Sequence, residues 1–292
     1  MRSVVNARLG LTAALVAAAS YGLMSYLVHW NPKQFPVEQM TVVRGLITMV
    51  GVLPFCWRDL WKYFQPDSLM LWLRAFTGAT GLFLYYYTLQ GTVSGNANFL
   101  FSSSPLFVSL LSWIFLKEGL TRTEMFGVAL IVFANVLLYI PNSSSMPLWV
   151  WETGLAGAMV SSLAFLSLGS ATKRYSSALI VFGFGAMSTV FAMFYPGRPW
   201  LEPTAGDWGY LVFVGVLGMS SQYLTTLSFA HLKNAIATSI GRTVVLFSGA
   251  LDIALAGYRP HPLEWVSYLV IIAGVAFTQE KEEPEARLAP PA

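Results

Sequence analysis

Long stretches without a charged residue divide this sequence. The longest covers residues 75–116, and others cover residues 9–28, 125–150, 153–172 and 212–230. About 20 apolar residues in a helix that rises 1.5 Å per residue cross the hydrocarbon core of a bilayer. A chain built largely from such stretches is expected to fold within a membrane.

The composition supports the same expectation. Charged residues make up 11% of the chain and hydrophobic residues 55%, whereas a soluble domain has about 25% charged residues. The chain lacks the polar surface of a soluble protein and is predicted to be an all-α polytopic membrane protein. The net charge of +3 is spread over many loops, so we expect no nucleic-acid partner. The single cysteine, Cys56, excludes an internal disulfide.

Charges and turn-forming residues divide the apolar stretches into ten predicted transmembrane helices. These are residues 9–28, 37–56, 70–88, 96–116, 124–140, 149–171, 176–195, 208–230, 235–256 and 263–279. A cytoplasmic amino terminus places eleven of the 17 basic residues on the inner side of the membrane and three on the outer side. The other three, Arg44, Arg74 and Arg242, fall inside the spans. Because cytoplasmic loops carry an excess of Lys and Arg, both termini are predicted to be cytoplasmic.

Two similar halves are also visible. Gly10-Leu11 opens the first span and Gly154-Leu155 the sixth, and the fifth span (residues 124–136) aligns with the tenth (264–276) at an offset of 140 residues. Residues 1–145 and 146–280 are therefore predicted to be two five-helix repeats, followed by a cytoplasmic tail at residues 281–292. An odd number of spans inverts the second repeat. Secondary transporters often use this plan and bind substrate between the halves.

A polar stripe runs along the predicted fourth span. On a continuous helix one face carries Asn98, Ser102, Pro105, Ser109 and Ser112, and the 140-residue offset pairs them with Thr238, Arg242, Val245, Gly249 and Asp252. Pro105 within a span is expected to kink the helix. We interpret the stripe as the lining of a water-accessible cavity. Alternatively, the serines bond carbonyls of their own helix and Asn98 joins two helices.

Charged residues inside spans are candidates for function. Arg242 either holds a substrate carboxylate through a charge-assisted pair or bonds a backbone carbonyl. Arg44 is interpreted as a structural tie near the outer end of its span. Asp252 is expected to be a surface carboxylate at the outer end of the ninth span.

Several motifs resemble the drug/metabolite transporter superfamily, in the branch that has ten spans built from two EamA-type repeats. The motifs are residues 42–45 (VVRG), 104–107 (SPLF), 115–118 (FLKE) and Glu124 followed by Gly127. The chain departs from the pattern in its ninth span, where Arg242-Thr243 stand in place of an early proline. Within the superfamily it looks most like bacterial exporters of aromatic and other hydrophobic amino acids, which implies a location in the bacterial cytoplasmic membrane.

The predicted function is therefore a secondary transporter that exports aromatic and other hydrophobic neutral amino acids by alternating access. No catalytic residue, metal or cofactor is predicted, and the chain contains no HExxH, GxSxG or phosphate-loop motif. The candidate substrate-binding residues are Tyr21, Tyr85, Tyr86, Asn98, Phe101, Ser102, Pro105, Ser162, Gln222, Thr238 and Arg242.

Two alternatives remain open. A carrier of sugar phosphates or nucleotide-linked sugars would need several basic groups in the cavity, and only Arg242 is well placed in the sequence. The other alternative is a membrane-bound enzyme or a passive scaffold, and the absence of any effect of single changes in the polar stripe would favour the scaffold.

Overall fold

The computed structural model describes residues 2–111, 121–232 and 234–278, and every regular element in these ranges is helical. The first half contains α1 (Arg2–Trp30), α2 (Val37–Cys56), the 3₁₀ helix η1 (Trp57–Phe64), α3 (Leu69–Gly91), α4 (Ser94–Phe101), α5 (Ser104–Leu111) and α6 (Arg122–Asn142). The second half contains α7 (Leu148–Ala171), α8 (Ser177–Phe194), α9 (Ala205–His231), α10 (Asn234–Gly241), α11 (Val244–Ala256) and α12 (Pro262–Thr278).

Several helices begin where the sequence supplies a start signal. Thr121 before α6 and Thr204 before α9 each accept an amide hydrogen three residues on, at Glu124 and Asp207, whose carboxylates bond back to the threonine amides. Such a capping box satisfies amide groups that the first helical turn leaves free. The helix α12 starts at Pro262, where the missing amide hydrogen has no cost.

The prediction of an all-helical membrane protein is confirmed. Over its described residues, each predicted span coincides with one helix or with two consecutive helices. Among the described residues, seven helical stretches are long and apolar enough to cross a membrane, and α12 is a shorter apolar helix. The count of ten crossings stays a prediction. Ser112, the motif at residues 115–118 and the tail at residues 281–292 lie outside the described residues.

The fourth and ninth predicted spans are not continuous helices. The first is broken at residues 102–103, between α4 and α5, and the second at residues 242–243, between α10 and α11. Pro105 is the second residue of α5, so it occupies a first helical turn, where proline fits, and does not kink a helix interior. The polar stripe therefore extends over two helices that join at a turn.

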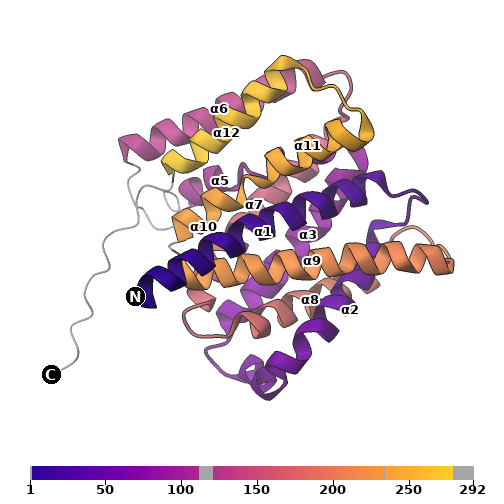
Figure 1. Ribbon diagram of the computed structural model, residues 1–292, viewed down its shortest axis with the longest axis vertical. Coiled ribbons are helices and arrows are strands. Elements are labelled where there is room, and N and C mark those ends of the chain that lie inside the picture. The colour runs from indigo at the N-terminus through magenta and orange to yellow at the C-terminus, as the bar shows by residue number, and fades with distance from the viewer. Residues whose placement is uncertain (1, 112–120, 233, 279–292) are drawn as a thin grey trace.

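The helices pack in pairs that join the two halves. The pairs are α2 with α8, α6 with α12, α1 with α9 and α3 with α7. Figure 1 shows α6 beside α12 at one edge, α2 beside α8 toward the other, and α1 beside α9 between them. If each helix is replaced by its counterpart in the other half, the α1–α9 pair becomes the α7–α3 pair. The α2–α8 pair and the α6–α12 pair each map onto themselves. This is the pattern expected of two halves related by a two-fold axis.

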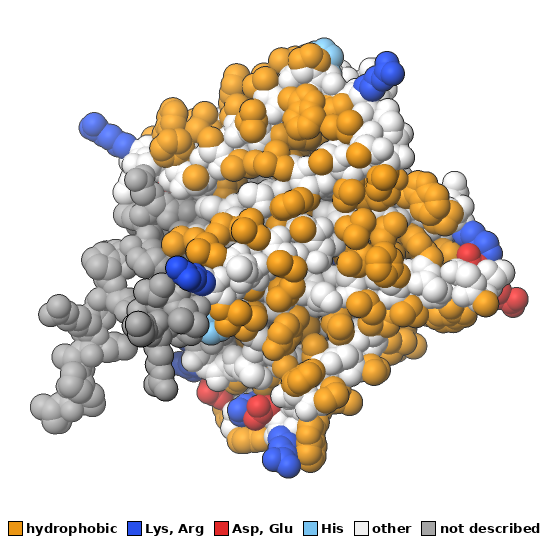
Figure 2. Space-filling view, viewed as in Figure 1, with side chains coloured by type: hydrophobic (Ala, Val, Ile, Leu, Met, Phe, Trp, Pro, Cys, Tyr) orange, Lys and Arg blue, Asp and Glu red, His pale blue; other side chains and the backbone are white. Residues whose placement is uncertain are grey.

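The outer surface of the bundle is apolar. Large side chains such as Phe194, Val50 and Leu269 are exposed, at 82%, 70% and 61% of their areas. Figure 2 shows hydrophobic side chains spread across the visible face, with the charged side chains mainly toward its rim. Since a soluble protein rarely exposes so much continuous apolar area, this surface is suited to contact with lipid.

Candidate functional site

Both helix breaks have the same local backbone structure. The amide hydrogens of Ser103 and Thr243 bond carbonyls three residues back, at Leu100 and Ile240, with N···O distances of 3.1 and 3.0 Å. The two breaks lie 140 residues apart, which is the offset at which the fifth and tenth predicted spans align. Discontinuous helices at membrane depth are tolerated where they are buried in protein or line a cavity.

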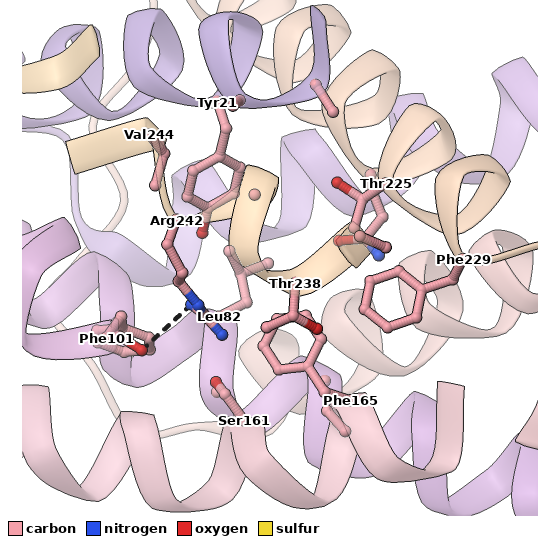
Figure 3. Close-up of a pocket in the computed structure, with 18 of the residues that line it drawn as sticks. Tyr21, Leu82, Phe101, Ser161, Phe165, Thr225, Phe229, Thr238, Arg242 and Val244 are labelled. Atoms are coloured by element: carbon pink, nitrogen blue, oxygen red, sulfur yellow. Dashed lines mark hydrogen bonds between the residues drawn. The ribbon is translucent and has the colours of Figure 1, made fainter. Parts of the chain in front are cut away.

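A cavity of about 140 Å³ lies beside these breaks. It is lined by α1, α2, α3 and α4 from the first half and by α7, α8, α9, α10 and Val244 of α11 from the second. In Figure 3 the side chains of Tyr21, Phe165 and Arg242 converge on it. The halves therefore share one cavity.

Six of the predicted substrate-binding residues line this cavity. They are Tyr21, Asn98, Phe101, Gln222, Thr238 and Arg242. They come from α1, α4, α9 and α10 and from the second break, so only the tertiary structure brings them together.

The other five candidates lie behind or beside the wall of the cavity. The Tyr85 ring packs 5.3 Å from the Tyr21 ring centroid, and its hydroxyl donates to Asn98 Oδ1 at 2.7 Å. Tyr86 accepts a hydrogen bond from Arg44. The hydroxyls of Ser102 and Ser162 donate to carbonyls of their own helices, and Pro105 starts α5.

Arg242 joins the second break to the first. Its Nη2 donates to Ser104 Oγ at 2.6 Å and its Nη1 to the Phe101 carbonyl at 3.3 Å. Its guanidinium carbon lies 4.9 Å from the Phe165 ring centroid, a distance typical of a cation–π contact. Both roles considered from the sequence are compatible with this geometry, because Arg242 bonds a carbonyl and also lines the cavity.

Arg44 lines the same cavity, although the sequence suggested only a structural tie. Its two Nη atoms donate to Tyr86 Oη and to the Gly218 carbonyl, each at 3.3 Å. A β-carbon at Gly218 would lie 2.4 Å from Arg44 Nε, so this close approach requires a glycine. Arg44 therefore combines the expected structural tie with a place in the cavity wall.

Arg74 is a lining residue that sequence reasoning missed. Its guanidinium carbon lies 5.4 Å from the Phe184 ring centroid, and a β-carbon at Gly78 would lie 2.0 Å from its Nη1. The sequence did offer one indication of its role, because Arg74, like Arg44 and Arg242, lies inside a predicted span. The cavity thus contains three arginines, where the sequence placed one.

None of the described carboxylates lines the cavity. Among the described residues, no group of three His, Cys, Asp or Glu side chains lies close enough to hold a metal ion. The site offers cationic, aromatic, hydroxyl and amide groups, a combination suited to binding an organic molecule.

Asp252 is buried, which corrects the expectation of a surface carboxylate. Only 1% of its area is exposed. It accepts hydrogen bonds from the Gly95 amide at 2.7 Å and from Ser94 Oγ at 2.8 Å. Asp252 of α11 therefore caps the amino terminus of α4, where a negative charge is stabilised by the helix dipole.

The chain continues from Asp252 into a polar cluster at the start of α12. The Tyr258 hydroxyl donates to both Glu264 oxygens, at 3.0 and 2.8 Å. Burial, with the nearby Glu264 carboxylate, raises the pKa of Tyr258 above its ordinary value. A tyrosine hydroxyl is protonated at neutral pH even at its ordinary pKa of about 10, so the upward shift only extends to higher pH the range in which Tyr258 keeps the bond that joins this loop to α12.

Comparisons with known proteins agree with the fold and the internal repeat. The profile of the EamA-like transporter family matches residues 8–140 and again residues 148–279. A solved crystal structure superposes with a TM-score of 0.64 and 14% sequence identity, covering 94% of this chain and 96% of that one. At that identity the likeness concerns the fold alone.

Named relatives cover nearly the whole chain. The pseudopaline exporter CntI of Pseudomonas aeruginosa is 24% identical over 276 residues, which are 94% of this chain and 97% of that protein. Solute carrier family 35 member G1 of Mus musculus is 24% identical over 264 residues, which are 84% and 71% of the two chains. The chain is thus a multi-pass membrane transporter and not an enzyme, and it belongs to the EamA-like transporter family.

Proposed function

We propose that this protein is a secondary transporter of the bacterial cytoplasmic membrane that exports small amphipathic carboxylates by alternating access. The observation that carries the proposal is the cavity that both halves line beside their matched helix breaks. In alternating access, one half rocks against the other around a site at their interface. Export as the direction is supported by the relative in Pseudomonas aeruginosa that is named an exporter.

Aromatic and other hydrophobic amino acids are the simplest members of this substrate class. The rings of Tyr21, Phe101, Phe165, Phe184 and Phe229 line the cavity and can stack on an aromatic side chain. A guanidinium can hold the carboxylate, and the Asn98 amide and the Thr238 hydroxyl can bond the ammonium group.

Carriage of phosphorylated or nucleotide-linked sugars is a second candidate, which a specific observation favours. Judged from the sequence, the site lacked enough positive charge for a phosphate. Arg44 and Arg74 line the cavity together with Arg242, which removes that objection. The aromatic lining favours the amphipathic carboxylates as the leading class.

The transport test uses purified protein in liposomes. We expect saturable exchange of phenylalanine, tryptophan or benzylsuccinate, which Asn98→Ala and Arg242→Ala slow more than Leu110→Val, since Leu110 does not line the cavity. Hexose phosphate that exchanges faster than every amphipathic carboxylate would establish the second candidate. Absence of saturable exchange of any of these compounds would reject transport by this site.

We also propose ten membrane crossings in two inverted repeats, with both termini in the cytoplasm. Counting α4–α5 and α10–α11 as one crossing each gives five crossings per half. A Cys56→Ser variant with cysteine introduced at Ser144, an exposed residue between α6 and α7, should react with an impermeant thiol reagent on intact cells. Reaction only after lysis would reverse the orientation.

A further inference from the structure

We infer that the cavity binds an organic anion with at least two carboxylates held apart on a small aromatic or apolar scaffold. This inference rests on the proposed function, because it defines the substrate class of the same cavity. It goes beyond a zwitterionic amino acid, whose single carboxylate meets one arginine.

The first observation is the amount of buried positive charge. Arg44, Arg74 and Arg242 line one cavity and are exposed by only 1%, 5% and 7%. Within the described residues, the Nε atom of each arginine is buried and has no hydrogen-bond partner. A buried cation without a counter-charge is destabilising by several kcal/mol, so three of them in one cavity require a compensating negative charge.

The second observation is that most of the described carboxylates are engaged elsewhere. Ion pairs join Lys33 to Asp207, Lys62 to Asp59 and Arg174 to Asp67. Asp252 caps α4, Glu264 bonds Asn142 and Tyr258, and Glu38 accepts from Tyr87. No described carboxylate lines the cavity, so a bound anion would supply the negative charge that the described lining lacks.

The third observation is that the arginines contact two different aromatic rings. Arg44 and Arg74 lie against the ring of Phe184, at 5.8 and 5.4 Å from its centroid, whereas Arg242 lies against Phe165. Each guanidinium can hold one carboxylate through two parallel hydrogen bonds. Two carboxylates on one scaffold fit this arrangement better than a single phosphate, whose charge is concentrated at one point.

The fourth observation concerns the scaffold. The cavity volume of about 140 Å³ is similar to that of an engineered protein cavity of about 150 Å³ that binds benzene. The lining also includes the Tyr21, Phe101 and Phe229 rings. A ligand with one ring-sized apolar part therefore fits this conformation.

Binding of matched compounds to the full chain in nanodiscs tests the inference. Benzylsuccinate has two carboxylates, 4-phenylbutyrate is the same skeleton with one, phenylalanine is the zwitterion, and phenyl phosphate supplies the phosphate alternative. We expect benzylsuccinate to bind at least about tenfold more tightly than the other three, because it adds a second charge-assisted contact. Isothermal titration gives the four affinities without requiring transport.

Variants show which arginines cause the preference for benzylsuccinate over 4-phenylbutyrate. Arg74→Gln and Arg242→Gln should each bring the benzylsuccinate and 4-phenylbutyrate affinities to within about twofold of each other, since each removes the counter-charge for one carboxylate. Arg174→Gln is the matched control, because Arg174 is exposed, pairs with Asp67 and does not line the cavity. If a variant fails to fold, the four affinities of the wild-type protein still test the inference.

Each other outcome rejects either the inference or the proposed function. Equal affinity for 4-phenylbutyrate and benzylsuccinate, or no binding of any probe, overturns the inference. Tighter binding of phenyl phosphate assigns the charge to a phosphorylated ligand and overturns the carboxylate class. If 4-phenylbutyrate and benzylsuccinate bind equally and phenylalanine shows saturable exchange, the inference is rejected and the proposed function stands. If benzylsuccinate binds tightly and no solute is exchanged, the proposed function is rejected.

Discussion

The two broken helices have the same backbone geometry and different chemistry. At the first break the Ser102 hydroxyl bonds the Asn98 carbonyl of its own helix, and Ser103 accepts a hydrogen bond from Asn135. At the second break Arg242 extends into the cavity and bonds Phe101 and Ser104 near the first break. Backbone symmetry and site chemistry are thus specified separately, and one half supplies the charge at the breaks.

This difference explains how a repeat can form an asymmetric site. A break needs only a tight turn whose amide groups are satisfied, and Ser103 and Thr243 meet that need equally well. The side chain at the turn is then free to vary. Four substitutions test how much each break contributes.

Replacing Arg242 by alanine should have the largest effect. We expect solute exchange to fall at least about tenfold, because hydrogen bonds to a charged group contribute about 1.5–3 kcal/mol and 1.4 kcal/mol is a factor of ten. Exchange rates in liposomes measure the change, with Arg174→Ala as the control. Wild-type exchange by Arg242→Ala would mean that the second break has no special role.

Asp252→Asn should act mainly on stability. The amide keeps an acceptor but loses the negative charge that caps α4, so we expect a loss of about 1–3 kcal/mol and a lower melting temperature. Thermal unfolding in detergent gives the shift, and Glu202→Gln, in an exposed loop, is the control. An unchanged melting temperature would show that α4 needs no cap from the second half.

Ser104→Ala should have a smaller effect than the loss of Arg242. Arg242 loses its 2.6 Å bond to Ser104 Oγ and keeps the bond to the Phe101 carbonyl. A bond to a charged group contributes about 1.5–3 kcal/mol, and the second bond remains, so exchange should fall roughly tenfold and less than in Arg242→Ala. Ser102→Ala is the matched control in the same break, since its hydroxyl bonds only its own helix. A greater loss in Ser102→Ala than in Ser104→Ala would contradict this assignment.

Pro105→Ala should have the smallest effect. The second half forms an equivalent break with Val245 at the matching position, so a proline is not required for the turn. We expect normal folding and exchange within about twofold of wild type, because proline in a first helical turn replaces no hydrogen bond. A tenfold loss would show that the first break, unlike the second, depends on its proline.

The sequence predicted much of the helical framework. Helix α2 begins and ends at the predicted residues 37–56, because uncharged stretches and turn signals define helices in a membrane. The helix breaks were not predicted, because serine, proline and arginine each occur in continuous helices as well. Whether a helix is interrupted depends on neighbours that satisfy its free backbone groups.

The lining of the cavity was predicted only in part, because it too depends on neighbours from other helices. Asn98 and Arg242 were identified because polar groups in an apolar span are conspicuous, whereas Arg74 received no role. Its importance arises from the Phe184 ring of α8 and from the space that Gly78 leaves. Those neighbours belong to no pattern within a single span.

By itself the sequence determined the membrane setting, the helical framework and the internal repeat, since hydropathy and charge act locally along the chain. The tertiary structure alone decided that Arg44, Arg74 and Arg242 surround one cavity and that Asp252 is buried as a helix cap. These facts depend on how one half packs against the other. Electrostatic energy in a low-dielectric interior depends on the distance between groups, and the order of residues does not set that distance.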